Sequence, residues 1–303
     1  MKALVFDRFG GPEVYRITDM PVPEPGQGEV QVEVFGAGLN PVDWKIREGH
    51  FPPAAPKAFP AVTLREFSGR ISKLGPGVTD FAVGEEVYGI TNVGAAAEYT
   101  VASTQAIGMR PPSMDFADSA VVPLAGMTAW QALFDHGDLQ NGQRVLVTAA
   151  SGGVGTYAVQ LAKWKGAYVI GTASAKNHSI LRELGADEVI DYTTTKVEQA
   201  VGNVDLVLHA TSPADFGASF AVLRTGGKIV SIVGPPPEEK AGKPVIPFMM
   251  QPSTANLNAL SGLIEDLKVR PVIDTIVPLE KAVQAMNELQ QGHTVGKMGI
   301  RIR

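Results

Sequence analysis

A glycine-rich segment at 145–163, VLVTAASGGVGTYAVQLAK, is the strongest indication of chemistry in this chain. An apolar run ends there in small residues and glycines, and helical spacing follows. The run fits the G-x-G-x-x-G/A pattern with alanine in the first position, so that the backbone can approach a pyrophosphate and the helix can pack closely on the strand. A structural turn is the alternative. We predict a dinucleotide site formed by Ala150, Ser151, Gly152, Gly153, Val154 and Gly155.

The end of the next predicted strand distinguishes the two nicotinamide cofactors. An NAD site needs a carboxylate there for the ribose 2′-hydroxyl, whereas an NADP site needs a cation and no acid. No Asp or Glu occurs between residues 139 and 182. Ser174 can donate a hydrogen bond to a 2′-phosphate and Lys176 can supply a positive charge, although a solvated lysine is the simpler interpretation of Lys176. We predict NADPH as the cofactor.

The predicted secondary structure differs between the two parts of the chain. Residues 1–110 read as short strands separated by Gly, Pro and Asn, with candidates at 2–6, 30–34, 67–73, 86–88 and 97–101. From residue 119 onward helices and strands alternate, which predicts an α/β fold with a doubly wound parallel sheet. We expect helices at 119–135, 155–165, 177–184, 215–223, 257–267 and 279–290, and strands at 144–148, 168–172, 188–190, 204–209, 228–233 and 298–302.

Bulk composition excludes several classes of function. The net charge of −5, without a basic run, argues against nucleic acid or an anionic membrane as a partner. No apolar stretch approaches 18 residues and the first residues lack the apolar region of a signal peptide, so we expect a cytoplasmic protein. The chain contains no cysteine, which excludes disulfides and thiolate metal sites.

Together with the segment order, seven motifs resemble a zinc-independent medium-chain dehydrogenase/reductase of the quinone oxidoreductase type. They are GLNPVDWKIREG (38–49), EFSGRISKLGPGVTDFAVGEEVYG (66–89), AAAEYTV (95–101), PLAGMTAWQAL (123–133), AASGGVG, LGADEVIDY (184–192) and GHTVGKMGI (292–300). The resemblance implies a GroES-like β-rich domain formed by residues 1–118 and 254–303, and a Rossmann NADP-binding domain at 119–253.

The same resemblance bears on metal chemistry. Zinc members of the family carry a cysteine at the place of Asn40, a Gly-His-Glu at residues 64–66, and a further cysteine near Leu124. This chain lacks all of these thiolates and the histidine. Five scattered histidines cannot rebuild a tetrahedral site, so we expect them to be structural or solvated and expect no metal: His50, His136, His178, His209 and His293.

Three residues are the catalytic candidates that the resemblance implies. Asn40 and Lys45 lie in the segment that lines the cleft in relatives, and Thr128 matches a threonine that meets the nicotinamide. Many quinone reductases have tyrosine at the place of Lys45, so this chain looks more like the enone and alkenal reductase branches. An ammonium beside a carbonyl oxygen would stabilise an enolate. The alternatives are that Lys45 covers a domain edge and that Thr128 packs in the core.

Other residues carry secondary expectations. Tyr192 matches a family position near the adenosine phosphate, although packing at a strand end would explain a tyrosine equally well. Asp43 should cap a turn, and Glu66 should form a salt bridge with Arg65 or Arg70. Edge strands of the Rossmann sheet commonly pair across a dimer in this family, and 243–250 is the candidate for a homodimer here.

The function expected from all this is NADPH-dependent hydride transfer to a quinone or an α,β-unsaturated carbonyl compound. Such acceptors are already electron-poor, so the reaction needs orientation and hydrogen bonds to the oxygen more than a Lewis acid. A one-electron quinone reductase and a non-catalytic NADPH-binding redox sensor or structural protein are the alternatives.

Overall fold

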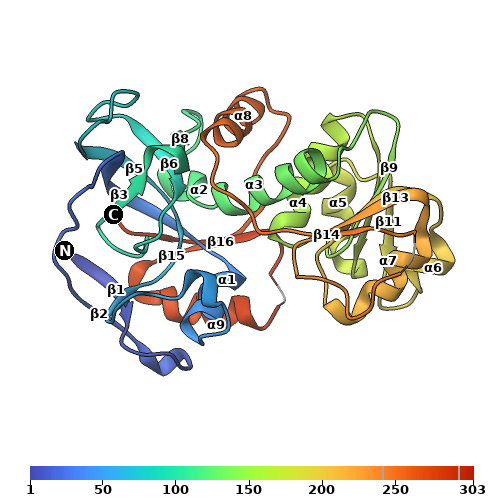
Figure 1. Ribbon diagram of the computed structural model, residues 1–303, viewed down its shortest axis with the longest axis horizontal. Coiled ribbons are helices and arrows are strands. Elements are labelled where there is room, and N and C mark those ends of the chain that lie inside the picture. The colour runs from blue at the N-terminus through green and yellow to red at the C-terminus, as the bar shows by residue number, and fades with distance from the viewer. Residues whose placement is uncertain (241, 293) are drawn as a thin grey trace. The chain divides into compact units, whose positions relative to one another are not determined.

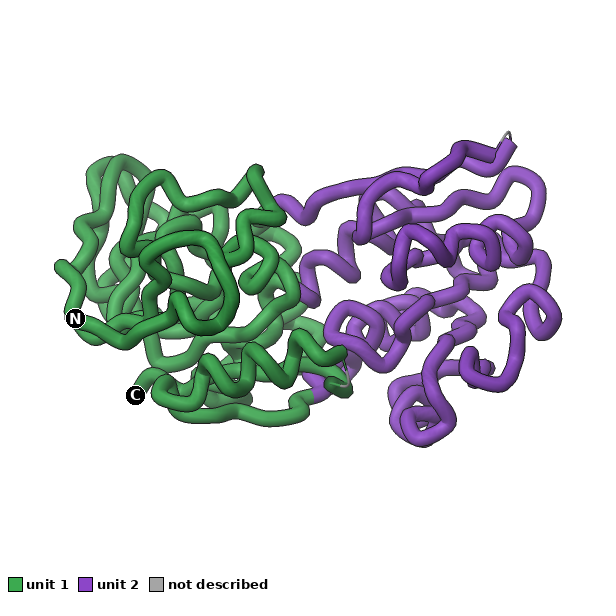
Figure 2. Tube along the Cα trace, turned by 90° about the horizontal axis from the view of Figure 1, so that it is seen from below, with its two compact units in different colours: residues 1–124, 252–265, 273–303 green, residues 125–251, 266–272 purple. Residues whose placement is uncertain are grey.

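The structure is a computed structural model that describes residues 1–240, 242–292 and 294–303 (Figure 1). These residues form two compact units, coloured separately in Figure 2. The first unit comprises Met1–Leu124, Pro252–Glu265 and Ile273–Arg303, and the second comprises Ala125–Gln251 and Asp266–Val272. The predicted domain boundaries, at residues 118/119 and 253/254, differ from the observed ones by a few residues. The prediction also assigned residues 266–272 to the first domain, whereas in the structure they return to the second unit.

A side-chain contact explains this short return. Gln160 donates from Nε2 to the Arg270 carbonyl oxygen and accepts from the Arg270 backbone N–H with Oε1, both at 2.9 Å. Because one amide satisfies both backbone groups of Arg270, residues 266–272 are fixed to the second unit.

The first unit contains two sheets. The larger one has the order β15-β16-β3-β5-β6-β8, with β7 paired to the first half of β3, and the smaller one has the order β2-β1-β4. Their strands are β1 Lys2–Phe6, β2 Tyr15–Asp19, β3 Glu29–Leu39, β4 Ala61–Val62, β5 Glu66–Leu74, β6 Glu86–Ile90, β7 Tyr99–Ser103, β8 Ile107–Met109, β15 Ile273–Pro278 and β16 Lys297–Arg301.

Strand β3 is longer than the predicted strand at 30–34. Two glycines interrupt the alternation of apolar and polar residues in its second half, so the sequence pattern ends before the strand does. A Cβ atom on Gly36 would lie 2.7 Å from the Ala117 Cα, and one on Gly38 would lie 2.2 Å from the Glu66 side chain. The strand therefore continues through two positions, 36 and 38, at which a side chain would clash, and β16 pairs with this second half. The C-terminal strand thereby joins the larger sheet beside β3, with Met298 opposite Leu39.

Four helices complete the described part of the first unit: α1 Pro41–Arg47, α2 Phe116–Ser119, α8 Thr254–Glu265 and α9 Ala282–Gln290. The sequence analysis did not predict α1, although Asn40 at its N-cap, Pro41 in its first turn and Asp43 three residues after the cap are typical of a helix start. Its short length conceals the apolar periodicity that longer helices show.

The second unit has one parallel sheet with the strand order β11-β10-β9-β12-β13-β14. Counted from β9, this is the order 3-2-1-4-5-6 of dinucleotide-binding folds. The strands are β9 Arg144–Val147, β10 Tyr168–Ala173, β11 Glu188–Asp191, β12 Val204–His209, β13 Leu223–Ser231 and β14 Val245–Pro247. The helices with their main part in this unit are α3 Pro123–Trp130, α4 Gly153–Trp164, α5 His178–Glu183, α6 Val197–Ala200 and α7 Phe216–Val222. The predicted α/β fold class, with one β-rich unit and one unit built on a doubly wound parallel sheet, is confirmed.

The predicted helix at 119–135 is wrong in one respect, because it is three segments in the structure. Helix α2 ends at Ser119, α3 starts at Pro123, and a π-helical turn follows at Gln131–His136. Proline disfavours helical conformation in the residue before it, which separates the first two segments.

The close packing of α4 on the loop after β9 generates a prediction. A methyl group on Gly155 would lie 2.4 Å from the Ala149 carbonyl oxygen and 2.6 Å from the Ala150 Cα. Gly155→Ala should therefore destabilise the protein by about 1–3 kcal/mol, measured by urea denaturation. Gly217→Ala is the matched control, since a Cβ there meets nothing within 4 Å and alanine favours the helix. Equal stability of the two variants would contradict this account of Gly155.

Candidate functional site

The predicted dinucleotide loop lies at the carboxyl end of β9, beside the point where strand order reverses between β9 and β12. Ala149 has a φ of +49°, and its backbone N–H donates to the Thr172 Oγ1 at 3.2 Å. The Ala150 backbone N–H donates to the Thr172 carbonyl oxygen at 3.0 Å. The end of β10 therefore fixes the loop. Residues 151–154 remain partly exposed, whereas Ala150 and Gly155 are buried.

The residues of this loop fit a dinucleotide. Helix α4 starts at Gly153, and the first N–H groups of a helix have no partner within it, so they can donate to phosphate oxygens. A Cβ on Gly152 would approach only the Ala149 carbonyl oxygen, at 3.3 Å. The loop carries no acidic side chain that would repel a pyrophosphate. Ala150 replaces the usual first glycine, and Gly171 on β10 leaves the space for its methyl group.

The turn after β10 holds the two residues predicted to bind a 2′-phosphate. Ser174 is partly exposed and uses no side-chain hydrogen bond to cap the short helix that follows it. Lys176 is exposed, and within the described part of the chain it makes no ion pair. Asn177, which the sequence analysis missed, donates from Nδ2 to the Ser151 Oγ at 3.0 Å. This one contact joins the turn to the glycine-rich loop.

A carboxylate also lies beside this turn. Asp191 ends β11 and is in register with Ala173 of β10. Hydrogen bonds from the side chain and backbone of Thr193, at 2.6 and 2.9 Å, keep the pKa of Asp191 below its usual value. Residues 139–182 contain no Asp or Glu, but the pairing of β11 with β10 places the Asp191 carboxylate beside the turn after β10. The neighbouring Tyr192 is 60% exposed, so it is not a packed strand-end residue.

The first unit holds a buried polar cluster, defined here as Asn40, Glu66 and Lys297. The Lys297 ammonium donates to the Leu39 carbonyl oxygen at 2.9 Å, to the Asn40 Oδ1 at 2.5 Å and to the Glu66 Oε1 at 2.7 Å. The Asn40 Nδ2 donates to the same Glu66 oxygen at 2.7 Å. All three residues are at most 3% exposed. The ammonium thus has one acceptor for each of its three hydrogens.

The salt bridge expected for Glu66 therefore exists, but both predicted partners are wrong. Arg65 donates to the Asn92 Oδ1 and Arg70 pairs with Glu86, whereas Glu66 pairs with Lys297. The other carboxylate oxygen of Glu66 accepts from the Leu124 backbone N–H at 2.7 Å. The sequence signal for Lys297 was weak, because 231 residues separate the two partners and only the pairing of β16 with β3 brings them together.

Asp43 adjoins this cluster on α1. Its Oδ2 accepts from the Asn40 backbone N–H at 2.8 Å, which confirms the expected capping role, while its Oδ1 is buried with no hydrogen-bond partner. Desolvation by burial raises the pKa of Asp43 to about 7, and the Glu66 carboxylate contributes in the same direction. A buried acid with an unpartnered oxygen is more stable protonated.

The other two catalytic candidates lie in different units. Lys45 is on α1 in the first unit and is partly buried, with its Nζ 5.6 Å from the centroid of the Trp44 ring. Thr128 is on α3, in the part that belongs to the second unit, and is 7% exposed. Their roles, and that of Asn40, stay predictions.

The histidines that the structure describes occupy structural or exposed positions. His209 is fully buried, contacts the Ser219 Oγ at 2.9 Å and the Ser212 carbonyl oxygen at 3.1 Å, and has a pKa lowered by burial. His50 is exposed, His136 packs on Phe248, and His178 contacts the Ala173 carbonyl oxygen. His293 lies outside the described residues. Among residues 1–240, 242–292 and 294–303, no three His, Asp or Glu side chains gather as a metal site would require.

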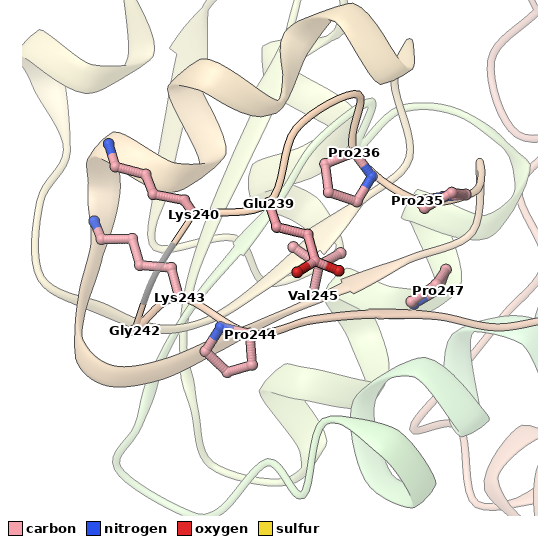
Figure 3. Close-up of a pocket in the computed structure, with 9 residues that line it drawn as sticks. All are labelled: Pro235, Pro236, Glu239, Lys240, Gly242, Lys243, Pro244, Val245 and Pro247. Atoms are coloured by element: carbon pink, nitrogen blue, oxygen red, sulfur yellow. The ribbon is translucent and has the colours of Figure 1, made fainter.

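A hollow of about 450 Å³ lies on the second unit, within the loop between β13 and β14. Pro235, Pro236, Pro244 and Pro247 supply much of its wall, and Figure 3 shows the Lys240 and Lys243 side chains extending away from Pro235 and Pro247. Proline offers no backbone N–H to a ligand. None of the predicted site residues lines this hollow.

One further structural finding concerns membranes. Among the described residues, no helix combines the length and apolar character needed to cross a bilayer.

Comparison with known proteins places the chain in a family. Residues 26–123 match the alcohol dehydrogenase GroES-like domain, and residues 184–298 match a family model described as zinc-binding dehydrogenase. The chloroplast envelope quinone oxidoreductase homolog of Arabidopsis thaliana is 35% identical over 98% of this chain and 97% of its own length. The NADPH-dependent alkenal/one oxidoreductase, chloroplastic, of the same plant is 33% identical over 98% of this chain and 78% of its own length.

A solved structure of a quinone oxidoreductase is also similar to this chain. The quinone oxidoreductase from Coxiella burnetii has a TM-score of 0.92 and 34% identity, covering 100% of this chain and 99% of that one. The chain therefore belongs to the medium-chain dehydrogenase/reductase family of NAD(P)-dependent oxidoreductases, as its motifs predicted.

The buried carboxyl of Asp43 predicts a pH dependence of stability. Its pKa of about 7 in the folded protein exceeds the unfolded value of 3.8, so the folded state retains a proton that the unfolded state releases. The stability contributed by that proton is therefore present at low pH and is lost as the pH rises to about 7. Asp43→Asn, which can keep the bond from the Asn40 N–H, should lack this loss.

Urea denaturation of both proteins at pH 5 and pH 8 measures the effect. The unfolding free energy of the wild type should fall by roughly 2–3 kcal/mol more than that of the variant. Identical pH dependence in the two proteins would show that Asp43 is ionised at both pH values.

Proposed function

We propose that this protein is a zinc-independent, NADPH-dependent reductase of quinones or α,β-unsaturated carbonyl compounds. The observation that carries the proposal is the fit of the loop after β9, with α4 starting at Gly153, to a dinucleotide in a parallel sheet of the order 3-2-1-4-5-6. The similarity to a quinone oxidoreductase homolog and to an alkenal/one oxidoreductase supports this choice of acceptors.

NADPH, when bound, supplies the hydride for such a reduction. The second unit binds it through the N–H groups at the start of α4, with Ser174, Lys176 and Tyr192 toward the adenosine phosphate. Thr128 orients the nicotinamide end. Lys45 in the first unit offers a positive charge and three donor hydrogens to the oxygen of the acceptor, where negative charge develops, and it can release a proton to the reduced product.

Zinc independence rests on the chemistry of the available ligands. The chain has no cysteine, and Asn40 stands where zinc members carry one. Both ends of the Asn40 amide are engaged by Lys297 and Glu66. A lysine ammonium beside these groups disfavours a second cation by direct repulsion. A quinone or enone needs no Lewis acid because conjugation already accepts the developing charge.

We also propose a cytoplasmic homodimer. The basis for the homodimer is the position of β14, which is the last strand of the parallel sheet and pairs with β13 on one side. Met249, which follows β14 after a short gap, is 50% exposed, so it does not fill the core of its own unit and is available to a second copy.

An acceptor panel tests the proposed activity. Oxidation of NADPH is followed at about 340 nm with a quinone, an alkenal and a cyclic enone, and the products are identified. We expect turnover of at least one acceptor and a product reduced by two electrons. Lys45→Met, which keeps the length of the side chain, should lower kcat on that acceptor while the Kd for NADPH stays the same.

The other outcomes each reject a part of the proposal. A semiquinone product would indicate one-electron chemistry. Tight NADPH binding without turnover of any acceptor would favour the non-catalytic sensor, and full activity of Lys45→Met would return that lysine to a structural role.

Cofactor preference gives a second prediction. Lys176→Ala should weaken NADPH binding roughly tenfold, the usual effect of one lost charge-assisted contact, and should leave the Kd for NADH unchanged. Asp191→Asn is the opposing variant, because its carboxylate lies beside the same turn and would repel a 2′-phosphate. It should strengthen NADPH binding. Equal losses for both cofactors in Lys176→Ala would contradict a 2′-phosphate site at this turn.

A further inference from the structure

The polar cluster of Asn40, Glu66 and Lys297 constrains one side chain in an unusual way. An asparagine amide is nearly symmetric in shape, so packing alone does not distinguish its oxygen from its nitrogen. Here the group facing the Asn40 Oδ1 is an ammonium, which can only donate, and the group facing the Asn40 Nδ2 is a carboxylate, which can only accept when ionised. The two charges therefore select one of the two amide orientations.

This orientation leaves one donor hydrogen. The Asn40 Nδ2 donates to the Glu66 Oε1, and its second hydrogen has no acceptor among residues 1–240, 242–292 and 294–303. Asn40 is 3% exposed, so a ligand can reach only a small part of this residue. The cluster itself is rigid, because Lys297 also bonds the Leu39 carbonyl oxygen and Glu66 also bonds the Leu124 backbone N–H.

The backbone provides the space for this arrangement. Gly38 lies opposite Glu66 in the β3–β5 pairing, and a Cβ there would overlap the Glu66 side chain at 2.2 Å. Strand β16 pairs with β3 beside Leu39 and starts with Lys297, which places the ammonium at the end of β3. A glycine, a buried acid and the C-terminal strand thus meet at the residue that precedes α1.

We propose that Lys297 is a positioning residue that acts through Asn40. With Glu66 it holds the Asn40 amide so that its second N–H is presented to the carbonyl oxygen of the acceptor. The inference rests on the proposed reductase function and extends it to the C-terminal strand, 257 residues away in sequence. A merely structural ion pair would stabilise the first unit, and the effect of its removal on kcat would not depend on the identity of residue 40.

A double-mutant cycle separates these two roles. Glu66→Gln/Lys297→Met removes both charges together, so neither is left buried without a partner. The neutral glutamine can donate or accept, so the Asn40 amide is free to adopt either orientation. We expect kcat to fall roughly 10-fold to 100-fold, a part of the effect of losing an oxyanion donor, with the Kd for NADPH unchanged within about twofold.

The same pair of substitutions in an Asn40→Ala background should change kcat by less than about twofold, because the group through which Lys297 acts is already absent. Tyr88→Phe is the matched control for stability. It removes a buried hydroxyl of the first unit that contacts the Leu257 carbonyl oxygen and the Ser261 Oγ, and it should leave kcat unaltered. An equal loss of kcat from the neutral pair in both backgrounds would overturn the proposal.

A second variant keeps the test decisive if the neutral pair does not fold. Asn40→Ser keeps a hydroxyl that can accept from Lys297 and donate to Glu66 but has no second donor hydrogen, so it should lose as much kcat as Asn40→Ala while circular dichroism and NADPH binding remain normal. Wild-type turnover by Asn40→Ser would overturn the role of the second N–H. If the wild type reduces no acceptor, the proposed reductase function is wrong. If the wild type is active and the Glu66→Gln/Lys297→Met variant is equally active, only the positioning role of Lys297 is wrong.

Discussion

The ion pair between Lys297 and Glu66 is the interaction on which the order of the first unit depends. Both groups are at most 3% exposed and their charged atoms are 2.7 Å apart. Removing one partner of such a pair leaves an uncompensated buried charge and costs about 3–5 kcal/mol. The pair therefore requires that β16 lies next to β3, that Gly38 has no side chain, and that Leu124 presents its N–H to Glu66.

This requirement connects segments that are remote in the chain. The pair joins the C-terminal strand to the start of β5, and Asn40 extends the network to the N-terminus of α1. Asp43 in the first turn of α1 then holds the Asn40 backbone N–H. Lys45, the candidate catalytic cation, follows two residues later on the same helix. Its position therefore depends on Asn40, which caps this helix and is held by Lys297 and Glu66.

In the second unit the corresponding constraint is the parallel sheet. Parallel strands bring their carboxyl ends to one edge, and at that edge the end of β10 supports the glycine-rich loop through Thr172. Thr148 contributes at the switch point, since its Oγ1 accepts from the Ala210 backbone N–H at 2.8 Å, which fixes the ends of β9 and β12 together. The cofactor residues are therefore positioned by backbone hydrogen bonds between strands, and Asn177 adds a side-chain link to Ser151.

Features with a local signal could be predicted from the sequence alone. Glycine spacing, the alternation of strands and helices, and the family motifs predicted both folds, the dinucleotide loop and the segment containing Asn40 and Lys45, because each depends on residues close together in the chain. Tertiary structure decided the rest. Lys297 as the partner of Glu66 and Asp191 beside the turn at Ser174 arise from strand pairing, and the raised pKa of Asp43 arises from burial. Pairing register and desolvation depend on the whole fold, so no local pattern of residue types encodes them.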